Sequence, residues 1–163
     1  MIAAVIALAG LARATGLDFP NGGAKLLPPE QAFRFSARAL DANTLEGRFD
    51  VADGYYLYRD KLRFALQSAP PAVGSMELPA GKRKHDEFFG DVEIYRGAVI
   101  VKLPIAGGVP GQRLILVADS QGCADAGVCY PPTRQRVELA VPVAGAGPGP
   151  QIAATPPRKG LFD

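Results

Sequence analysis

The residues best suited to chemistry are Cys123 and Cys129, the only two cysteines in a chain of 163 residues. Five residues separate them, and these include Gly127, which can adopt backbone angles that other residues avoid. A tight turn here would allow the two sulfur atoms to meet across a hairpin. Pro131 and Pro132 follow, and they stiffen the exit from the segment. Thiol and disulfide chemistry is therefore the first chemistry to consider.

Three kinds of site can be built from such a pair. A structural disulfide that closes so short a loop contributes about 2–2.5 kcal/mol in chain-entropy models. A structural zinc site needs four ligands, and the chain adds only His85 to the two cysteines, so we expect neither a metal nor another cofactor. A redox-active pair would cycle between dithiol and disulfide through a mixed disulfide with a partner. The spacing alone does not distinguish the structural disulfide from the redox-active pair.

The residues between the cysteines include no Lys, Arg or His that would favour a thiolate. Asp125 lies among them, and its negative charge would disfavour a thiolate if it were close. We therefore expect a poor general reductant, which reacts well only when a partner supplies an activating environment.

The elements that must position the cysteines read as short strands. Alternation of apolar and polar residues predicts half-buried strands, and no segment shows a convincing helical stripe. We expect one helical turn at Pro29–Ala32 and a long loop at Pro79–Gly90. The expected strands are Phe33–Ala39, Leu45–Val51, Tyr55–Tyr58, Leu62–Leu66, Ala98–Ile105, Leu114–Ala118 and Val137–Val143, with a further short one at Ser75–Leu78.

This pattern predicts an all-β fold, an immunoglobulin-like antiparallel β-sandwich over residues 17–143. The length corresponds to one domain with tails, and it is sufficient to bury a core without help from disulfides. Gly, Pro and Ala dominate residues 144–163, so we expect a flexible tail that adds nothing to the core.

The N-terminus, residues 1–14, is similar to a secretory leader. Met1 to Ala12 is apolar and uncharged but too short to span a bilayer, which takes about 20 residues. Ala12-Arg13-Ala14 has the form of a cleavage site, although no basic residue precedes the apolar run. We expect export to an oxidising compartment, where two cysteines pair readily. The alternative is a buried N-terminal strand or helix.

The charges of the chain nearly balance, with 18 Lys and Arg residues against 16 Asp and Glu residues. The longest basic run is Lys82-Arg83-Lys84. This distribution argues against a nucleic acid or an acidic membrane as the partner.

Four segments occur in an order that adds a further indication. They are Asp53-Gly54-Tyr55-Tyr56-Leu57-Tyr58-Arg59, Asp86-Glu87-Phe88-Phe89-Gly90, Glu93-Ile94-Tyr95-Arg96 and Gln121 to Pro132. With these segments the chain resembles the N-terminal periplasmic domain of DsbD, the thiol:disulfide interchange protein. The likeness runs from about Leu17 to Val143. The cysteine segment and the Asp-Glu-Phe-aromatic-Gly loop are its specific parts.

The resemblance implies an immunoglobulin-like fold and a protein-disulfide reductase module that relays reducing equivalents in the periplasm. It implies thioredoxin-like partners: the C-terminal domain of DsbD as donor, and periplasmic disulfide isomerases and a cytochrome c maturation reductase as acceptors. A tether to the inner membrane is expected only if the chain is part of a longer protein.

The resemblance also implies roles for individual residues. Cys129 would form the mixed disulfide with a partner, Cys123 would resolve it, and Phe88 would cover the pair as a cap. The other residues expected near the site are Asp86, Glu87 and Phe89 in the cap, and Tyr55, Tyr56, Tyr58, Asp125 and Tyr130 as supporting residues. Without the resemblance, the aromatic residues would read as packing and the charged ones as solvated loop residues.

A second function remains open at this point. The chain could be a non-enzymatic binding or assembly module in which the disulfide only staples a hairpin. Such a staple should resist mild reductants, and its removal should chiefly lower stability.

Overall fold

A computed structural model describes residues 26–67 and 71–155 of the chain. The leader predicted at residues 1–14 lies outside this part. The described residues form an antiparallel β-sandwich with one helical turn, α1 (Pro29–Ala32), and one turn of 3-10 helix, η1 (Arg59–Lys61). The predicted all-β, immunoglobulin-like class and the predicted helical turn are confirmed.

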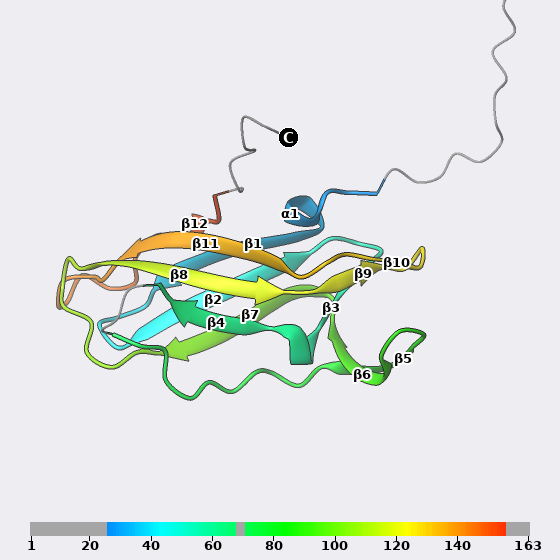
Figure 1. The fold of residues 1–163 in the computed structure, drawn as a ribbon. Coiled ribbons are helices and arrows are strands. Elements are labelled where there is room, and N and C mark those ends of the chain that lie inside the picture. Colours follow the sequence, from blue (N-terminus) through cyan, green and yellow to red (C-terminus); the bar gives the residue numbers. More distant parts are fainter. Residues whose placement is uncertain (1–25, 68–70, 156–163) are drawn as a thin grey trace, which may run out of the picture.

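One layer of the sandwich is a four-stranded sheet with the order β12-β1-β2-β7. In Figure 1 it lies behind the strands β4, β8 and β11. Alternation along β1 buries Phe33, Phe35, Ala37 and Ala39 and turns the residues between them outward. The strands are β1 (Phe33–Ala39), β2 (Thr44–Val51), β7 (Gly97–Pro104) and β12 (Ile152–Ala153).

The facing layer is divided between two sheets. A three-stranded sheet has the order β11-β8-β4, and a five-stranded sheet has the order β10-β9-β3-β6-β5. The three strands are β4 (Arg63–Leu66), β8 (Arg113–Ser120) and β11 (Thr133–Ala140). The five strands are β3 (Tyr55–Tyr58), β5 (Lys82–Asp86), β6 (Gly90–Tyr95), β9 (Gly122–Ala124) and β10 (Val128–Cys129).

The core lies between the layers and is built around aromatic rings. Phe35 and Phe49 come from the four-stranded sheet, and their ring centroids lie 6.0 and 6.3 Å from that of Phe64 on β4. Ring pairs at such spacing add to the stabilisation from apolar burial. The chain therefore has a substantial core without the disulfide, as its length predicts.

The structure differs from the sequence-based expectation in the segment 75–90. Lys82–Asp86 was expected within a loop, but it forms β5 and pairs with β6 in a hairpin. The strand is almost entirely charged and lies at a sheet edge, where charged side chains protect an exposed backbone. The short strand expected at Ser75–Leu78 does not form; instead Val73 makes an isolated bridge to Ile105.

The expectation that the tail adds nothing to the core is wrong for residues 152–154. Ile152 and Ala153 pair with Ala37 and Ser36 as strand β12, and Ile152 and Ala154 pack against the core. The free edge of β1 can pair with this short segment although the residues before it are rich in Gly and Pro. Main-chain hydrogen bonds between strands need no particular side chain. Among the described residues, no helix is long and apolar enough to cross a bilayer.

Candidate functional site

The two cysteines form a disulfide across a short hairpin at one end of the sandwich. Strands β9 and β10 place Cys123 and Cys129 directly opposite each other, with their Cα atoms 4.0 Å apart. Gly127 makes the turn with a φ of +82°, and its N–H donates to the carbonyl of Ala124. Cys123 is fully buried, whereas Cys129 is partly exposed. An incoming sulfur can therefore reach Cys129 more easily than Cys123.

The buried half of the hairpin is held tightly by strand β3. Strand β9 pairs with β3, and Cys123 lies opposite Tyr56. The backbone at Gly122 approaches so closely that an added Cβ would lie 2.3 Å from the carbonyl oxygen of Tyr56 and 2.6 Å from Cζ of Phe33. Only glycine fits here, so Gly122 is a structural requirement of the site that the sequence analysis did not identify.

Two tyrosines of β3 face the disulfide. The hydroxyl of Tyr58 lies 3.0 Å from Cys123 Sγ and 3.8 Å from Cys129 Sγ. Tyr56 packs edge-on against Tyr58 and donates a hydrogen bond of 2.6 Å to Asp86. Burial raises the pKa of Tyr58, and burial together with the Asp86 carboxylate raises the pKa of Tyr56 to about 12. Both hydroxyls therefore stay protonated and can donate.

Asp86 anchors the turn between β5 and β6. One carboxylate oxygen accepts the Tyr56 hydrogen bond, and the other accepts the backbone N–H groups of Phe88 and Phe89 at 2.9 and 3.3 Å. The side chain is 1 % exposed. Burial alone would raise the pKa of Asp86, but these hydrogen bonds outweigh it and lower the pKa to about 2. An ionised carboxylate thus ties the turn to β3.

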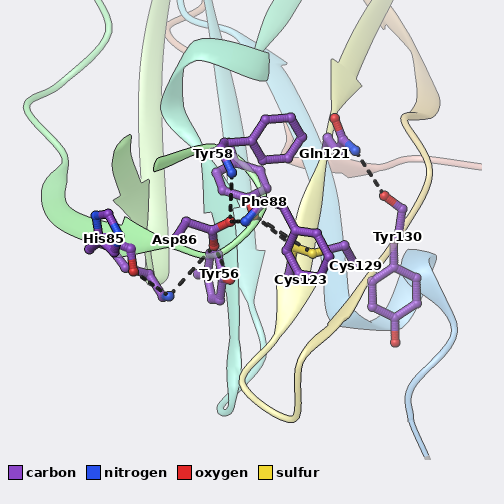
Figure 2. Close-up of a disulfide and its surroundings, with 11 residues drawn as sticks. Tyr56, Tyr58, His85, Asp86, Phe88, Gln121, Cys123, Cys129 and Tyr130 are labelled. Carbon is purple, nitrogen blue, oxygen red and sulfur yellow. Dashed lines mark hydrogen bonds and ion pairs between the residues drawn. A yellow bond between two sulfur atoms is a disulfide. The ribbon is translucent and has the colours of Figure 1, made fainter. Parts of the chain in front are cut away.

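Phe88 and Phe89 occupy this turn and remain exposed, at 59 % and 44 %. Figure 2 shows Phe88 extending from the turn towards the disulfide. The ring of Phe89 packs edge-on against Tyr58 at 4.9 Å between centroids, and Lys61 Nζ lies 4.8 Å from the Phe89 centroid. Glu87 is exposed in the same turn. A hollow of about 180 Å³ lies between this turn and the loop of the cysteine hairpin.

Tyr55 and Tyr130, expected beside the sulfurs, lie on the other face. The Tyr55 hydroxyl accepts the N–H of Leu27, and the Tyr130 hydroxyl donates to the carbonyl of Leu27. Both rings pack around Phe33 in the main core, and Figure 2 shows Tyr130 pointing away from the disulfide. They pack on the face of the hairpin opposite the disulfide and make no contact with the sulfur atoms.

Asp125 was expected near the site, where its negative charge could oppose a thiolate. Its carboxylate is instead paired with a guanidinium. Arg96 donates two hydrogen bonds to its carboxylate, at 2.6 and 2.9 Å. This pairing lowers the pKa of Asp125. Arg96 had no assigned role in the sequence analysis, although the Glu93–Arg96 segment was one of the indications of the family.

His85 bonds Asp91 at 2.7 Å through its ring Nδ1, on an exposed part of the β5–β6 hairpin. Within the ranges that the structure describes, no three His, Cys, Asp or Glu side chains gather as a group that could hold a metal ion.

The fold and the site together define a class: an immunoglobulin-like sandwich with a partly accessible disulfide hairpin at one end, beside an aromatic turn. Comparisons with known proteins give the family. Residues 23–141 match the family described as "Thiol:disulfide interchange protein DsbD, N-terminal". The chain belongs to this family.

Relatives and solved structures agree with the match. The chain is 46 % identical over 128 residues to the thiol:disulfide interchange protein DsbD of Ralstonia nicotianae, and 37 % identical over 124 residues to that of Vibrio vulnificus. These alignments cover 78 % and 76 % of the chain but only 20 % of each relative. The chain thus spans about a fifth of the curated relatives it matches.

Two solved structures come from Neisseria meningitidis. The reduced DsbD N-terminal domain has a TM-score of 0.64 at 37 % identity, covering 76 % of this chain and 94 % of that one. The complex between the DsbD N-terminal and PilB N-terminal domains has a TM-score of 0.60 at 35 % identity, covering 83 % and 95 %.

Proposed function

We propose that this chain is a thiol–disulfide relay domain that passes two electrons at a time between protein partners through Cys123 and Cys129. The observation that carries the proposal is the unequal exposure of the two sulfurs. A relay needs one sulfur that a partner can reach and a second one nearby to release the partner. Cys129 is partly exposed and Cys123 is fully buried against it.

The reaction runs in two exchanges. In the reduced domain, the Cys129 thiolate attacks the disulfide of an oxidised partner, forms a mixed disulfide and releases one partner thiolate. Cys123, after losing its proton to solvent, then attacks Cys129 Sγ and breaks the intermolecular bond. The second partner thiolate leaves, so the domain is oxidised by two electrons and the partner is reduced by two.

The turn between β5 and β6 acts as a cap in this proposal. Phe88 shields the sulfurs from small oxidants until a partner displaces it, while Asp86 holds the base of the turn through Tyr56 and two backbone N–H groups. Phe89 stays packed on Tyr58, and Glu87 borders the opening. The apolar surface of Phe88 and Val128, 59 % and 42 % exposed, suits contact with a protein rather than with water.

The partners in this proposal are thioredoxin-like domains in the periplasm. The DsbD C-terminal domain is the electron donor, and periplasmic disulfide isomerases and a cytochrome c maturation reductase are acceptors. Family membership supports this class of partner, and a solved complex of a related DsbD N-terminal domain shows that such a domain binds another protein domain.

A trapping experiment tests the roles of the two cysteines. A Cys123→Ala variant, reduced and mixed with an oxidised thioredoxin-like domain, should accumulate a mixed disulfide through Cys129. The matched Cys129→Ala variant should accumulate far less, because Cys123 is buried. Equal trapping by both variants, or trapping by neither, would contradict the assignment.

The reduction potential separates a relay from a structural staple. Equilibration with thiol buffers should give a value well above about −300 mV, below which structural disulfides usually lie. The fold should also survive in both redox states, since the core does not depend on the disulfide. A much lower value, or unfolding on reduction, would favour a binding module with a stapled hairpin.

A further inference from the structure

We propose that Arg96 is a positioning residue for the exchange reaction: through Asp125 it clamps the loop between the cysteines, so that Cys129 stays opposite Cys123 when the disulfide is reduced. This inference rests on the proposed function, because a purely structural disulfide would have no working reduced state. It assigns a role to a residue outside the cysteine segment and outside the cap.

The clamp joins separate parts of the fold. Arg96 lies between β6 and β7, and its guanidinium holds the Asp125 carboxylate with both Nη atoms, at 2.9 and 2.6 Å. The same Nη1 also donates to the carbonyl of Tyr55 at 3.1 Å. A forked pair of this kind fixes direction as well as distance, which a single charge contact does not. Arg96 thereby links the hairpin loop to β3.

The two halves of the hairpin differ in how firmly they are held. Cys123 lies on β9, which pairs with β3 on one side and with β10 on the other. Cys129 lies on β10, a strand of two residues at the sheet edge that pairs only with β9. Once the S–S bond is broken, the position of Cys129 depends on the hairpin backbone, on the neighbouring Tyr130, whose hydroxyl donates to the Leu27 carbonyl, and on whatever fixes the loop before it.

Asp125 is the point at which the loop is fixed. Its N–H donates to the carbonyl of Gly54 at 2.7 Å, while its side chain is held by Arg96. The residue that follows β9 is thus attached through both backbone and side chain. Removing Arg96 leaves only the backbone attachment.

The Arg96–Asp125 pair also compensates the negative charge of Asp125 beside the cysteines. An unpaired Asp125 would oppose the thiolate that forms when the disulfide opens. With the guanidinium at 2.6 and 2.9 Å the carboxylate is paired, so the negative charge near the hairpin is compensated. Arg96 therefore acts on the reduced pair in two ways: its geometry keeps the two thiols close, and its charge offsets that of Asp125.

The reduction potential measures the first effect directly. A preorganised dithiol closes to the disulfide more readily, so loosening the loop makes the disulfide easier to reduce. We expect Arg96→Gln and Asp125→Asn each to shift the dithiol–disulfide equilibrium towards the dithiol by about threefold to tenfold. This corresponds to a potential about 14 to 30 mV less negative.

The double variant tests whether the two residues act as one unit. Arg96→Gln/Asp125→Asn should shift the potential no further than either single variant, since the second substitution removes an interaction that is already lost. Arg96→Lys keeps the charge and loses the fork, so it should shift the potential in the same direction. A wild-type potential in Arg96→Lys would overturn the geometric role.

A matched control is available on the other layer. Arg48 forms a forked pair with Asp50 on β2, and the side-chain exposures, 37 % and 33 %, are close to the 38 % and 48 % of Arg96 and Asp125. Arg48→Gln should leave the potential unchanged. The inference is overturned if Arg96→Gln behaves as wild type, or if Arg48→Gln produces the same shift.

Thiol-buffer titration needs no protein partner, so the outcome for Arg96 is independent of the relay itself. If wild-type protein forms no mixed disulfide with a thioredoxin-like domain, the proposed function fails while the potentials of the variants still report on the clamp. If trapping succeeds and the potentials do not move, the clamp alone is wrong. In a working relay, release of the partner from the mixed disulfide should also be severalfold slower in Arg96→Gln.

Discussion

The hydroxyl of Tyr58 lies 3.0 Å from Cys123 Sγ, which gives the buried sulfur of the pair a polar neighbour. Because the pKa of Tyr58 is raised by burial, this hydroxyl keeps its proton at neutral pH. When an incoming thiolate attacks Cys129, Cys123 must leave as a thiolate. The Tyr58 hydroxyl is placed to donate a hydrogen bond to the charge that develops there.

Tyr58→Phe should therefore slow reduction of the disulfide. A hydrogen bond to a charged group contributes about 1.5 kcal/mol or more, so the rate of attack by dithiothreitol should fall about tenfold or more. Stopped-flow measurement at fixed pH gives this rate. Tyr55→Phe is the matched control, because its hydroxyl bonds Leu27 on the far face. It should lower stability by about 1 kcal/mol without changing the rate. An equal effect of both variants would refute the role of Tyr58.

Phe88→Ala should have the opposite effect on the same rate. Removing the ring uncovers the sulfurs, so reduction by small thiols should become severalfold faster. Because Phe88 is 59 % exposed, the free energy of unfolding should change by less than about 0.5 kcal/mol. Phe89→Ala, which removes the ring packed on Tyr58, should instead destabilise the fold by about 1 kcal/mol. An unchanged rate in Phe88→Ala would remove the cap from the mechanism.

The strands of the sandwich were predictable because each buries one face. The alternation from Phe33 to Ala39 matches β1 residue for residue, since a one-residue shift would expose the whole apolar set. Strand β5 was not predictable for the opposite reason. Lys82–Asp86 is a charged edge strand that is held by main-chain pairing to β6, and its side chains carry no period.

The site was predictable in part. The cysteine segment and the aromatic turn identified the family, but Tyr55 and Tyr56 could not be told apart. Neighbouring side chains of a strand point to opposite faces, and only the pairing of β3 with β9 determines which face meets the sulfurs. The Arg96–Asp125 pair joins residues 29 positions apart, so no local sequence pattern predicts it.

Two glycines of the cysteine segment allow a test of local structure. Gly122→Ala should destabilise the protein by about 3 kcal/mol or more, because the new methyl group would meet the Tyr56 carbonyl and the Phe33 ring. Gly127→Ala should cost only about 1 kcal/mol, since its φ of +82° is strained for alanine but the space around it is open. Urea unfolding of both variants gives these values. A smaller loss for Gly122 than for Gly127 would contradict the close approach of β9 to β3.

Asp86 should make the stability of the domain depend on acid pH. Its pKa of about 2 in the folded protein lies below the ordinary value of 3.8, so its contribution is complete above about pH 4 and is lost as the pH falls towards 2. The shift corresponds to about 2 kcal/mol. Asp86→Asn should therefore be less stable than wild type by about this amount at pH 6, and the difference should shrink steadily between about pH 4 and pH 2. Urea unfolding across this range measures it. A difference that stays constant from pH 6 to pH 2 would mean that the charge of Asp86 does not stabilise the turn. Its contacts with Tyr56 and the turn would then contribute in a way that does not depend on ionisation.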